Sequence, residues 1–382
     1  MTENVTEGIV LQAHKKPSIA SAHLLLTDEC NLRCVYCFHT KKPQSMDGKT
    51  ATRALDWCAS MADKRIHFEL FGGEPLLNWD VILILLDYSR LRATELSKKI
   101  TLGCVTNASL LTSERARILA EYAVPLLLSY DGPYTNEATR GHTRDVEAGL
   151  RNALAARLKC TVAMQACANH TKHLYENFIS IEGMGFNTIA INPVTHCYEP
   201  YGEQDWVHIR AALQQLAEHQ FDRYVTGKGA VYTQLNKHVK TIKAFMARPY
   251  DLTTKNRSCG ACKYSIAIDP AGNILPCHQM QPGSGFDHYI MGNVNDGTYD
   301  SEIRDRMLMR QQIDMCISCP VIVCSPCRVI NYQINHNEMM PGHDACMYQR
   351  LMFDVAVNLY NKLIDSEIWD GPKYPAGREC SV

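Results

Sequence analysis

The sequence has no excess of positive or negative charge. Its 39 lysines and arginines nearly balance 40 aspartates and glutamates, which leaves a formal net charge of -1 over 382 residues. A chain this close to neutral offers no global electrostatic reason to bind nucleic acid or an anionic membrane, and we expect neither as a partner. Because 46% of the residues are hydrophobic, the composition excludes intrinsic disorder and favours one large domain or two to three small ones.

Long hydrophobic runs are also lacking. The longest aliphatic run is 81–86, whereas a membrane span needs about 18 apolar residues. Residues 1–17 contain no apolar core of the kind that marks a secretory signal. We therefore expect a soluble, cytoplasmic protein, in which thiols stay reduced.

Cysteines are too sparse for a disulfide scaffold, since 17 in 382 residues is well below the roughly 8–10% of such proteins. They are also unevenly spread, because three lie within 30–37 and eight within 259–346. Reduced cysteines gathered in this way in a cytosolic chain indicate metal binding or catalysis.

Between the two cysteine groups, short apolar runs alternate with longer amphipathic stretches. The predicted strands are 22–27, 66–71, 100–106, 125–130, 161–168 and 188–192. The predicted helices are 49–61, 79–96, 112–122, 145–158, 172–184 and 203–224, with Thr112 and Asp145 as expected N-caps. Six βα units in series predict an α/β fold with a parallel sheet and right-handed crossovers, either open and doubly wound or a barrel. In both architectures ligands bind at the carboxyl ends of the strands.

Helical periodicity lapses after residue 248, where cysteine, proline and glycine become frequent. We therefore predict four parts: an N-terminal extension over 1–21, an α/β domain with its following helices over 22–248, a cysteine-rich domain over 249–346, and a C-terminal helix and tail over 347–382. We expect metal, rather than a large apolar core, to hold the cysteine-rich domain together.

The first cysteine group has the spacing C-x3-C-x2-C at Cys30, Cys34 and Cys37, directly after the first predicted strand. Three thiolates can hold three corners of a four-iron cluster and leave the fourth iron open, as a catalytic metal centre requires. The alternatives are a zinc site, for which His39 lies two residues further on, and a chance grouping of buried thiols.

Residues 30–38 resemble the C-x3-C-x-aromatic-C signature of the radical S-adenosylmethionine (SAM) superfamily. Three further stretches resemble that family's SAM pocket and occur in the same order: Gly72-Gly73-Glu74-Pro75, Val105-Thr106-Asn107 and Ser129-Tyr130-Asp131-Gly132-Pro133. The resemblance covers residues 22–194 and implies a partial (β/α)6 TIM-type barrel. It also implies that SAM chelates the open iron and is cleaved reductively to a 5′-deoxyadenosyl radical, which abstracts a hydrogen atom from the substrate.

The resemblance implies a role for each residue of the predicted SAM pocket. Gly72 and Gly73 let the backbone approach the methionine moiety, and Glu74 pairs with its ammonium group. The other predicted SAM-binding residues are Tyr36 and Phe38 beside adenine, Pro75 and Asp131 within the motifs, Asn107 and Ser129 toward ribose or carboxylate, and Arg140 toward the carboxylate. The alternatives are a plain turn at 72–75, strand-end hydrogen bonds at Asn107 and Ser129, and a solvated Arg140.

The second group has eight cysteines, which make two sets of four: Cys259, Cys262, Cys277, Cys316, Cys319, Cys324, Cys327 and Cys346. Spacing alone allows two structural zinc ions or two fully ligated [4Fe–4S] clusters. The block resembles the SPASM extension of radical SAM enzymes that modify peptides and proteins, such as anaerobic sulfatase maturases. That resemblance implies three [4Fe–4S] clusters in all, with one auxiliary cluster on Cys259, Cys262, Cys277 and Cys327 and the other on Cys316, Cys319, Cys324 and Cys346.

Two features depart from the SPASM pattern. The two spacings that precede Cys324 and Cys327 are each one residue shorter than usual, which leaves the cluster partners of Cys327 open. In sulfatase maturases an aspartate general base follows the cysteine that matches Cys277, whereas this chain has His278. We predict that His278 is either a catalytic base or a residue that donates a hydrogen bond to a cluster sulfur.

These features favour a radical SAM/SPASM oxidoreductase that oxidatively modifies a residue of a peptide or protein, above all a ribosomally made precursor, by crosslinking or dehydrogenation. The alternatives are a sulfatase-maturing enzyme that makes formylglycine, a small-molecule radical SAM dehydrogenase, and a metal-binding scaffold without SAM chemistry. The expected partners are the peptide or protein substrate, a low-potential electron donor of the flavodoxin or ferredoxin type, and a separate peptide-recognition protein.

Overall fold

The computed structural model describes residues 18–196, 198–248, 259–308, 313, 316, 319–324 and 326–375. Its main feature is a nine-stranded sheet with the strand order β7-β6-β5-β4-β3-β2-β1-β8-β9. The strands are β1 (Ser21–Thr27), β2 (Arg65–Gly72), β3 (Lys99–Thr106), β4 (Leu126–Ser129), β5 (Cys160–Ala166), β6 (Thr188–Pro193), β7 (Val231–Tyr232), β8 (Ser265–Ile268) and β9 (Ile274–Leu275). Neighbouring strands are parallel except β8 and β9, which are antiparallel.

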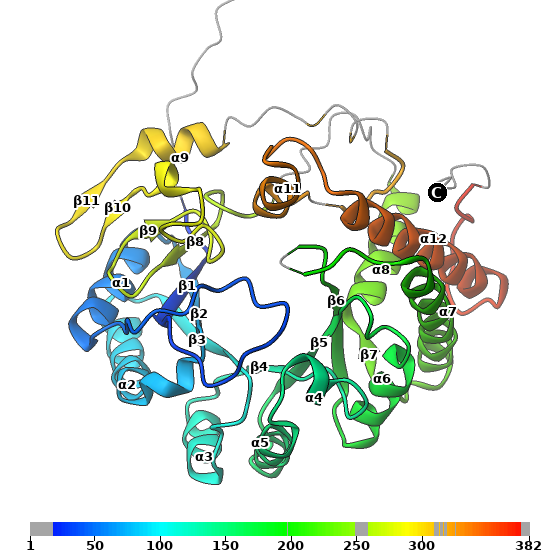
Figure 1. Ribbon diagram of the computed structural model, residues 1–382, viewed down its shortest axis with the longest axis horizontal. Coiled ribbons are helices and arrows are strands. Elements are labelled where there is room, and N and C mark those ends of the chain that lie inside the picture. Colours follow the sequence, from blue (N-terminus) through cyan, green and yellow to red (C-terminus); the bar gives the residue numbers. More distant parts are fainter. Residues whose placement is uncertain are drawn as a thin grey trace, which may run out of the picture.

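Helices connect the parallel strands. They are α1 (Gly48–Ser60), α2 (Trp79–Glu95), α3 (Ser113–Glu121), α5 (Thr143–Ala155), α6 (Leu174–Gly183), α7 (Glu203–Thr226) and α8 (Thr233–Ala247), with the short helices η1 (Pro75–Asn78) and α4 (Asn136–Thr139) between them. Figure 1 shows the strands following one another round an arc that is open on one side, with α1, α2, α3, α5, α6 and α7 outside it. The fold is therefore a partial (β/α)6 TIM-type barrel, extended at its edges by β7 and β8.

The sequence explains where these elements begin and which way their side chains point. On β1, Leu24 and Leu26 are fully buried in the large core with the helices, as period-two alternation requires. At the start of α3, the Thr112 hydroxyl accepts a hydrogen bond from the Arg115 backbone N–H at 3.2 Å, so the predicted cap is confirmed. The expected cap at Asp145 is wrong, because α5 begins at Thr143 after His142, and Asp145 lies in the first helical turn.

The cysteine-rich region extends the barrel instead of forming a separate body. Strand β8 pairs with β1 from Ser21 opposite Ser265 to Leu24 opposite Ile268, so one sheet continues across the predicted boundary at 248/249. Its apolar side chains also belong to the same buried core as those of the barrel, beside the cysteines that we expect to bind metal. The remaining elements are η3 (Asp287–Tyr289), β10 (Gly292–Asn293), β11 (Thr298–Tyr299), α9 (Ser301–Leu308), α11 (Arg328–Asn335) and α12 (His343–Asp365).

The C-terminal helix closes the opposite side. Helix α12 packs against α7 and α8. Figure 1 shows α9, α11 and α12 arranged across the open side of the arc of strands. The C-terminal region therefore borders the barrel both at β1, through β8, and at the open side of the arc, through α9, α11 and α12.

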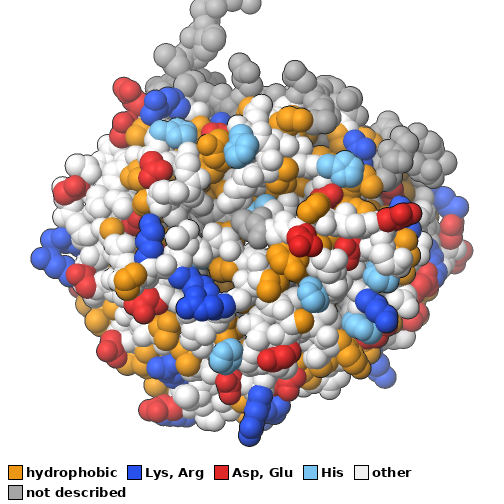
Figure 2. All heavy atoms as spheres, viewed as in Figure 1, with side chains coloured by type: hydrophobic (Ala, Val, Ile, Leu, Met, Phe, Trp, Pro, Cys, Tyr) orange, Lys and Arg blue, Asp and Glu red, His pale blue; other side chains and the backbone are white. Residues whose placement is uncertain are grey.

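Two further features concern membranes and surface charge. Within the described ranges, no helix is both long enough and apolar enough to cross a membrane. Figure 2 shows basic and acidic side chains interspersed over the face viewed down the barrel. This face therefore presents no field of a single sign that would steer a charged partner onto it.

Candidate active site

The three cysteines of the first group lie together at the mouth of the barrel. The loop that follows β1 carries Cys30, Cys34 and Cys37, and all three thiols are free and border one cavity of about 600 Å³. The cavity is also lined by Gly72 and Gly73 after β2, and by further residues from β3, β4, β5 and β6. Residues predicted from separate stretches of sequence thus meet at one site, at the strand ends where parallel barrels bind ligands.

The glycine pair lets the end of β2 press against the cysteine loop. A Cβ on Gly73 would lie 2.1 Å from the Glu29 carbonyl oxygen, and one on Gly72 would lie 2.3 Å from that of Thr27. The Gly73 backbone N–H donates to the Thr27 carbonyl at 2.7 Å, which fixes this contact. Gly72 also has a φ of +134°, which a side chain would strain. Both glycines are therefore required by backbone contact as well as by access to the cavity.

Substituting Gly73→Ala should weaken SAM binding at least ~10-fold, because the added methyl group must push the cysteine loop away from the cavity wall by an ångström or more. Equilibrium dialysis of SAM against the anaerobically reconstituted protein measures the effect. Gly183→Ala is the matched control, because a Cβ on Gly183 at the end of α6 meets no atom within 4 Å. Equal SAM affinity in the two variants would contradict this account of the glycine pair.

A buried network holds the cysteine loop from behind. The Tyr36 hydroxyl donates to Asp131 Oδ2 at 2.5 Å, and Arg140 pairs with Asp131 Oδ1 at 3.1 Å. Thr139 Oγ1 donates to Oδ2 at 2.7 Å, and the Gln165 backbone N–H donates to Oδ1 at 2.9 Å. Burial opposes the charge on Arg140, but the Asp131 carboxylate outweighs it and raises the pKa of Arg140. Asp131 is thus the common acceptor that ties the loop to β4, α4 and β5.

Glu74 is fully buried and already has its hydrogen-bond partners. Its Oε1 accepts from the Leu76 backbone N–H at 3.0 Å and from Thr106 Oγ1 at 2.7 Å, and its Oε2 accepts from the Asn107 N–H at 2.8 Å. Burial raises the pKa of Glu74 to about 6. These bonds join the ends of β2 and β3, so the carboxylate supports the cavity wall.

The cavity includes most of the predicted SAM-binding residues and omits three. Those that line it are Tyr36, Phe38, Gly72, Gly73, Asn107, Ser129 and Arg140. Glu74, Pro75 and Asp131 are not among the lining residues, and Glu74 and Asp131 are buried. Direct contact between these three and the cofactor remains a prediction, while the structure gives Glu74 and Asp131 supporting contacts of their own.

His278 reaches the same cavity from the C-terminal region. Its ring packs 4.7 Å from the His23 ring, 4.8 Å from Phe71 and 6.0 Å from Phe38, measured between centroids. Burial, followed by the neighbouring His23 and His39, lowers the pKa of His278 to about 3, so the imidazole is neutral near pH 7. Its Nδ1 is buried without a hydrogen-bond partner among the described residues, which marks a polar position that a ligand would satisfy.

Some cysteines of the second group are electrostatic neighbours of one another. The pKa of Cys277 is raised to about 12, chiefly by burial and in smaller part by the neighbouring Cys327 and Cys259. Burial likewise raises the pKa of Cys262 to about 12, with Cys277 and Cys259 as contributing neighbours. Cys346 has Cys319 as an electrostatic neighbour.

The residues present at the first cysteine group fit a four-iron cluster. The Leu32 N–H and Asn107 Nδ2 both approach Cys30 Sγ, at 3.4 Å and 4.0 Å, as donors suited to a thiolate ligand. In the part of the chain that is described, no three cysteine, histidine or carboxylate side chains converge on a single metal ion. This is compatible with a cluster, in which each thiolate binds a different iron atom.

Sequence reasoning missed several cavity residues. They are His23, Lys41, Glu69, Gln165, Asn192, His196 and Gln279. A signal was available on β1 and β2, where His23 and Glu69 interrupt otherwise apolar runs at alternate positions. The others could not be found in this way, because they lie on loops or at strand ends that only the fold brings to the cavity.

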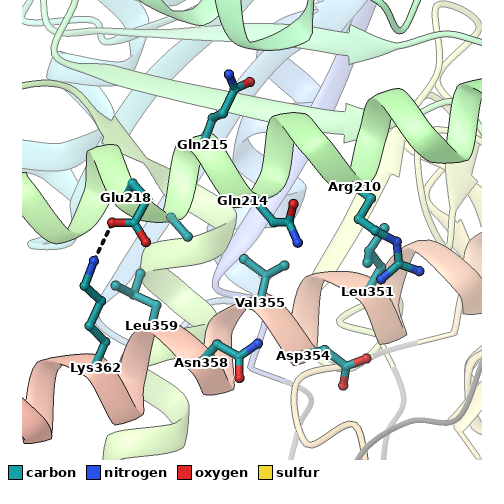
Figure 3. Close-up of a pocket in the computed structure, with 11 residues that line it drawn as sticks. Arg210, Gln214, Gln215, Glu218, Leu351, Asp354, Val355, Asn358, Leu359 and Lys362 are labelled. Carbon is teal, nitrogen blue, oxygen red and sulfur yellow. Dashed lines mark hydrogen bonds and ion pairs between the residues drawn. The ribbon is translucent and has the colours of Figure 1, made fainter.

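A second cavity, of about 470 Å³, lies outside the barrel between α7 and α12. Figure 3 shows Arg210 and Glu218 of α7 facing Asp354 and Lys362 of α12, with an ion pair between Lys362 and Glu218. Its lining contains no cysteine or histidine. The barrel cavity is therefore the candidate active site.

Comparison with known proteins finds similarity over the barrel region. The sequence model of the Radical SAM superfamily matches residues 24–178. The chain is 24% identical over 338 residues to the radical SAM cyclopropyl synthase TigE of Paramaledivibacter caminithermalis, which covers 80% of this chain and 66% of that protein. The chain therefore spans a little less than two thirds of TigE.

Solved structures agree with this fold. Native anSMEcpe with bound AdoMet and Cp18Cys peptide superimposes with a TM-score of 0.73 at 19% identity, over 91% of this chain and 99% of that one. Streptococcus suis SuiB bound to precursor peptide SuiA superimposes with a TM-score of 0.60 at 17% identity, over 86% and 76%. At 17–19% identity, these two structures show a likeness of fold. Residues 24–178 are therefore similar to the radical SAM superfamily over the part of the chain that carries the first cysteine group and the glycine pair.

Proposed function

We propose that this chain is a radical SAM/SPASM enzyme that oxidatively modifies a residue of a peptide or protein, by crosslinking or dehydrogenation. The observation that carries the proposal is the single barrel cavity, which joins three free cysteines and the glycine pair to His278 of the C-terminal region. The lining of the cavity combines the three cysteines with imidazole and aromatic rings, which would contact a substrate.

The residues of this chain would divide the work at the site. Cys30, Cys34 and Cys37 would hold the cluster, and SAM bound there would supply a 5′-deoxyadenosyl radical. Tyr36, on the cysteine loop, and Arg140 both bind Asp131. These contacts would hold the loop in place at the cavity wall. The rings of Phe38 and Phe71 pack against that of His278 and form an aromatic part of the cavity wall.

Net oxidation requires that an electron leave the substrate after hydrogen abstraction. The electrostatic neighbours of Cys277 include Cys259 and Cys327, which supports an auxiliary [4Fe–4S] cluster on Cys259, Cys262, Cys277 and Cys327. The second set would be Cys316, Cys319, Cys324 and Cys346, of which Cys346 and Cys319 are neighbours. Clusters with all four corners held suit electron transfer rather than substrate binding.

The peptide as substrate is supported by the relatives. TigE is described as a cyclopropyl synthase, and the anSMEcpe and SuiB structures hold a peptide and a precursor peptide. Formylglycine formation in a sulfatase is the second candidate, because the fold likeness to anSMEcpe extends over 91% of this chain. The neutral, buried His278 in place of the maturase aspartate favours the first candidate.

Anaerobically reconstituted protein should contain about twelve iron and about twelve sulfide atoms per chain, for three [4Fe–4S] clusters. With dithionite, SAM and peptides encoded beside its gene, it should form 5′-deoxyadenosine and a peptide lighter by about two mass units, the loss of two hydrogens. A sulfatase as the only accepted substrate would establish the second candidate. Zinc without sulfide, and no deoxyadenosine, would contradict both.

A further inference from the structure

The barrel interior contains a ladder of polar side chains below the cavity. His23 of β1 stands directly opposite Glu69 of β2 in the parallel register, and Glu69 stands opposite Gly103 of β3. One layer further from the cysteine loop, His67 stands opposite Thr101. Since residues two apart on a strand share a face, these side chains point into the barrel together. Strands of a parallel sheet are normally apolar on both faces, so packing does not account for this ladder.

The chain makes room for this ladder at Gly103. A Cβ at that position would lie 3.0 Å from Glu69 Oε1 and 3.0 Å from His67 Nε2. Glycine inside a strand weakens it and commonly marks close approach by another group. The missing side chain at Gly103 therefore allows the carboxylate of Glu69 and the ring of His67 to meet inside the barrel, where His67 Nε2 lies 3.4 Å from Glu69 Oε2.

The ladder joins the cavity to solvent at the far end of the barrel. His23 and Glu69 line the cavity. The His67 side chain is 38% exposed, and its Nδ1 lies 3.0 Å from the Thr101 hydroxyl, which is also exposed. His23 and Glu69 are neighbours across the β1–β2 register and Glu69 meets His67, so a series of ionisable groups runs from the cavity wall toward the amino-terminal ends of β2 and β3.

We propose that His23, Glu69 and His67 form the route by which the proton of the substrate leaves the active site. This inference rests on the proposed oxidation. In that reaction a substrate C–H bond breaks and its hydrogen atom goes to the deoxyadenosyl radical. The substrate radical then loses one electron to an iron–sulfur cluster of the C-terminal cysteines and one proton to His23, as the new bond forms. Glu69 and then His67 carry the proton on to solvent.

The surroundings of His23 suit it to accept a proton and release it. The pKa of His23 is lowered overall, chiefly by burial and in smaller part by His67. The Glu69 carboxylate and a backbone hydrogen bond with Ile266 of β8 act in the opposite direction. The His278 ring faces it at 4.7 Å and the Phe71 ring at 6.1 Å. The imidazole is therefore neutral near pH 7, with a carboxylate beside it that stabilises its protonated form.

The first test needs no substrate. Deuterium exchange at the imidazole Cε1–H of each histidine, followed by mass spectrometry against pH, gives the pKa of His23 in the reconstituted holoprotein. The isosteric variant Glu69→Gln removes the carboxylate, so the pKa of His23 should fall further. Glu114→Gln, an exposed residue in the first turn of α3, is the control and should leave it unchanged. An unchanged His23 pKa in Glu69→Gln would overturn the proposed route.

The second test uses the peptide accepted by the wild-type protein. In Glu69→Gln, hydrogen abstraction should persist while oxidised peptide falls by about 10²-fold, so deoxyadenosine accumulates without product. His67→Gln should lower the product less, and raising the pH should restore it in both variants. A structural defect would instead lower deoxyadenosine and product together, and that result would overturn the route. If the wild-type protein oxidises no peptide, the proposed function fails while the first test still decides whether His23 and Glu69 are coupled.

Discussion

The Asp131→Asn variant should lose about 3–5 kcal/mol of the free energy of unfolding, because it removes one partner of a buried ion pair. Asp131 is 1% exposed, and Arg140 is 8% exposed. An amide in place of the carboxylate leaves the guanidinium without a counter-charge in the protein interior. Four donors share the two carboxylate oxygens: Tyr36, Thr139, Arg140 and the Gln165 backbone N–H. The amide replaces one of these oxygens with an NH2 group, so two of the donors lose their acceptor.

Urea unfolding of the holoprotein under argon measures this loss, with Asp145→Asn as the control. Asp145 is also an aspartate near a helix start, but its side chain is 63% exposed, and its contact with His142 at 3.4 Å is worth little in water. Asp131→Asn should in addition release the cysteine loop, so its SAM affinity should fall in protein that is still folded at low urea. A stability equal to that of Asp145→Asn would show that Asp131 does not anchor the loop.

The barrel could be predicted because its elements follow local rules. The six predicted strands and six predicted helices all occur, with ends that differ by a few residues. The pairing of β8 with β1 could not be predicted, because Ser265–Ile268 is a short apolar run more than 230 residues from its partner strand. Such a strand is defined by a long-range contact, and period or propensity carries no information about that contact.

The site shows the same division between local and distant information. The spacing of Cys30, Cys34 and Cys37 and the glycine pair are local features, and the structure brings both to one cavity. The direction of the Glu74 side chain is only partly local, because besides the Leu76 N–H it depends on donors at the end of β3 that the sequence places 32 and 33 residues away. A motif therefore predicts which strand ends meet, but not which side chains face the ligand.

His278 illustrates how a substitution changes the chemistry expected at one position. An aspartate there would place a charge in the cavity, whereas the imidazole is neutral and packs between His23 and Phe71. The negative charge of the cavity wall lies instead on Glu69, deeper in the barrel. Under the proposed route, the acceptor of the substrate proton is His23 on the barrel strands rather than His278 in the C-terminal region.

Cys34→Ala should abolish the formation of 5′-deoxyadenosine, which would separate the first cysteine group from the second. Without this thiolate the SAM-binding cluster lacks one of its three protein ligands, so the reconstituted protein should hold about eight iron atoms rather than about twelve. High-performance liquid chromatography of the nucleoside and colorimetric iron analysis measure the two quantities. Cys58→Ala is the control: it removes a fully buried thiol of α1 that lies in the core, and should cost about 1 kcal/mol of stability while activity persists.

The corresponding change in the second group should have a different outcome. Cys277→Ala should also lower the iron content by about four atoms, but deoxyadenosine should still form because the cysteine loop is untouched. The oxidised peptide should not form, since the substrate electron then has no acceptor beside His278. If Cys34→Ala and Cys277→Ala lost both products alike, the C-terminal cysteines would be required for SAM cleavage or for folding, and their assignment to electron removal would be wrong.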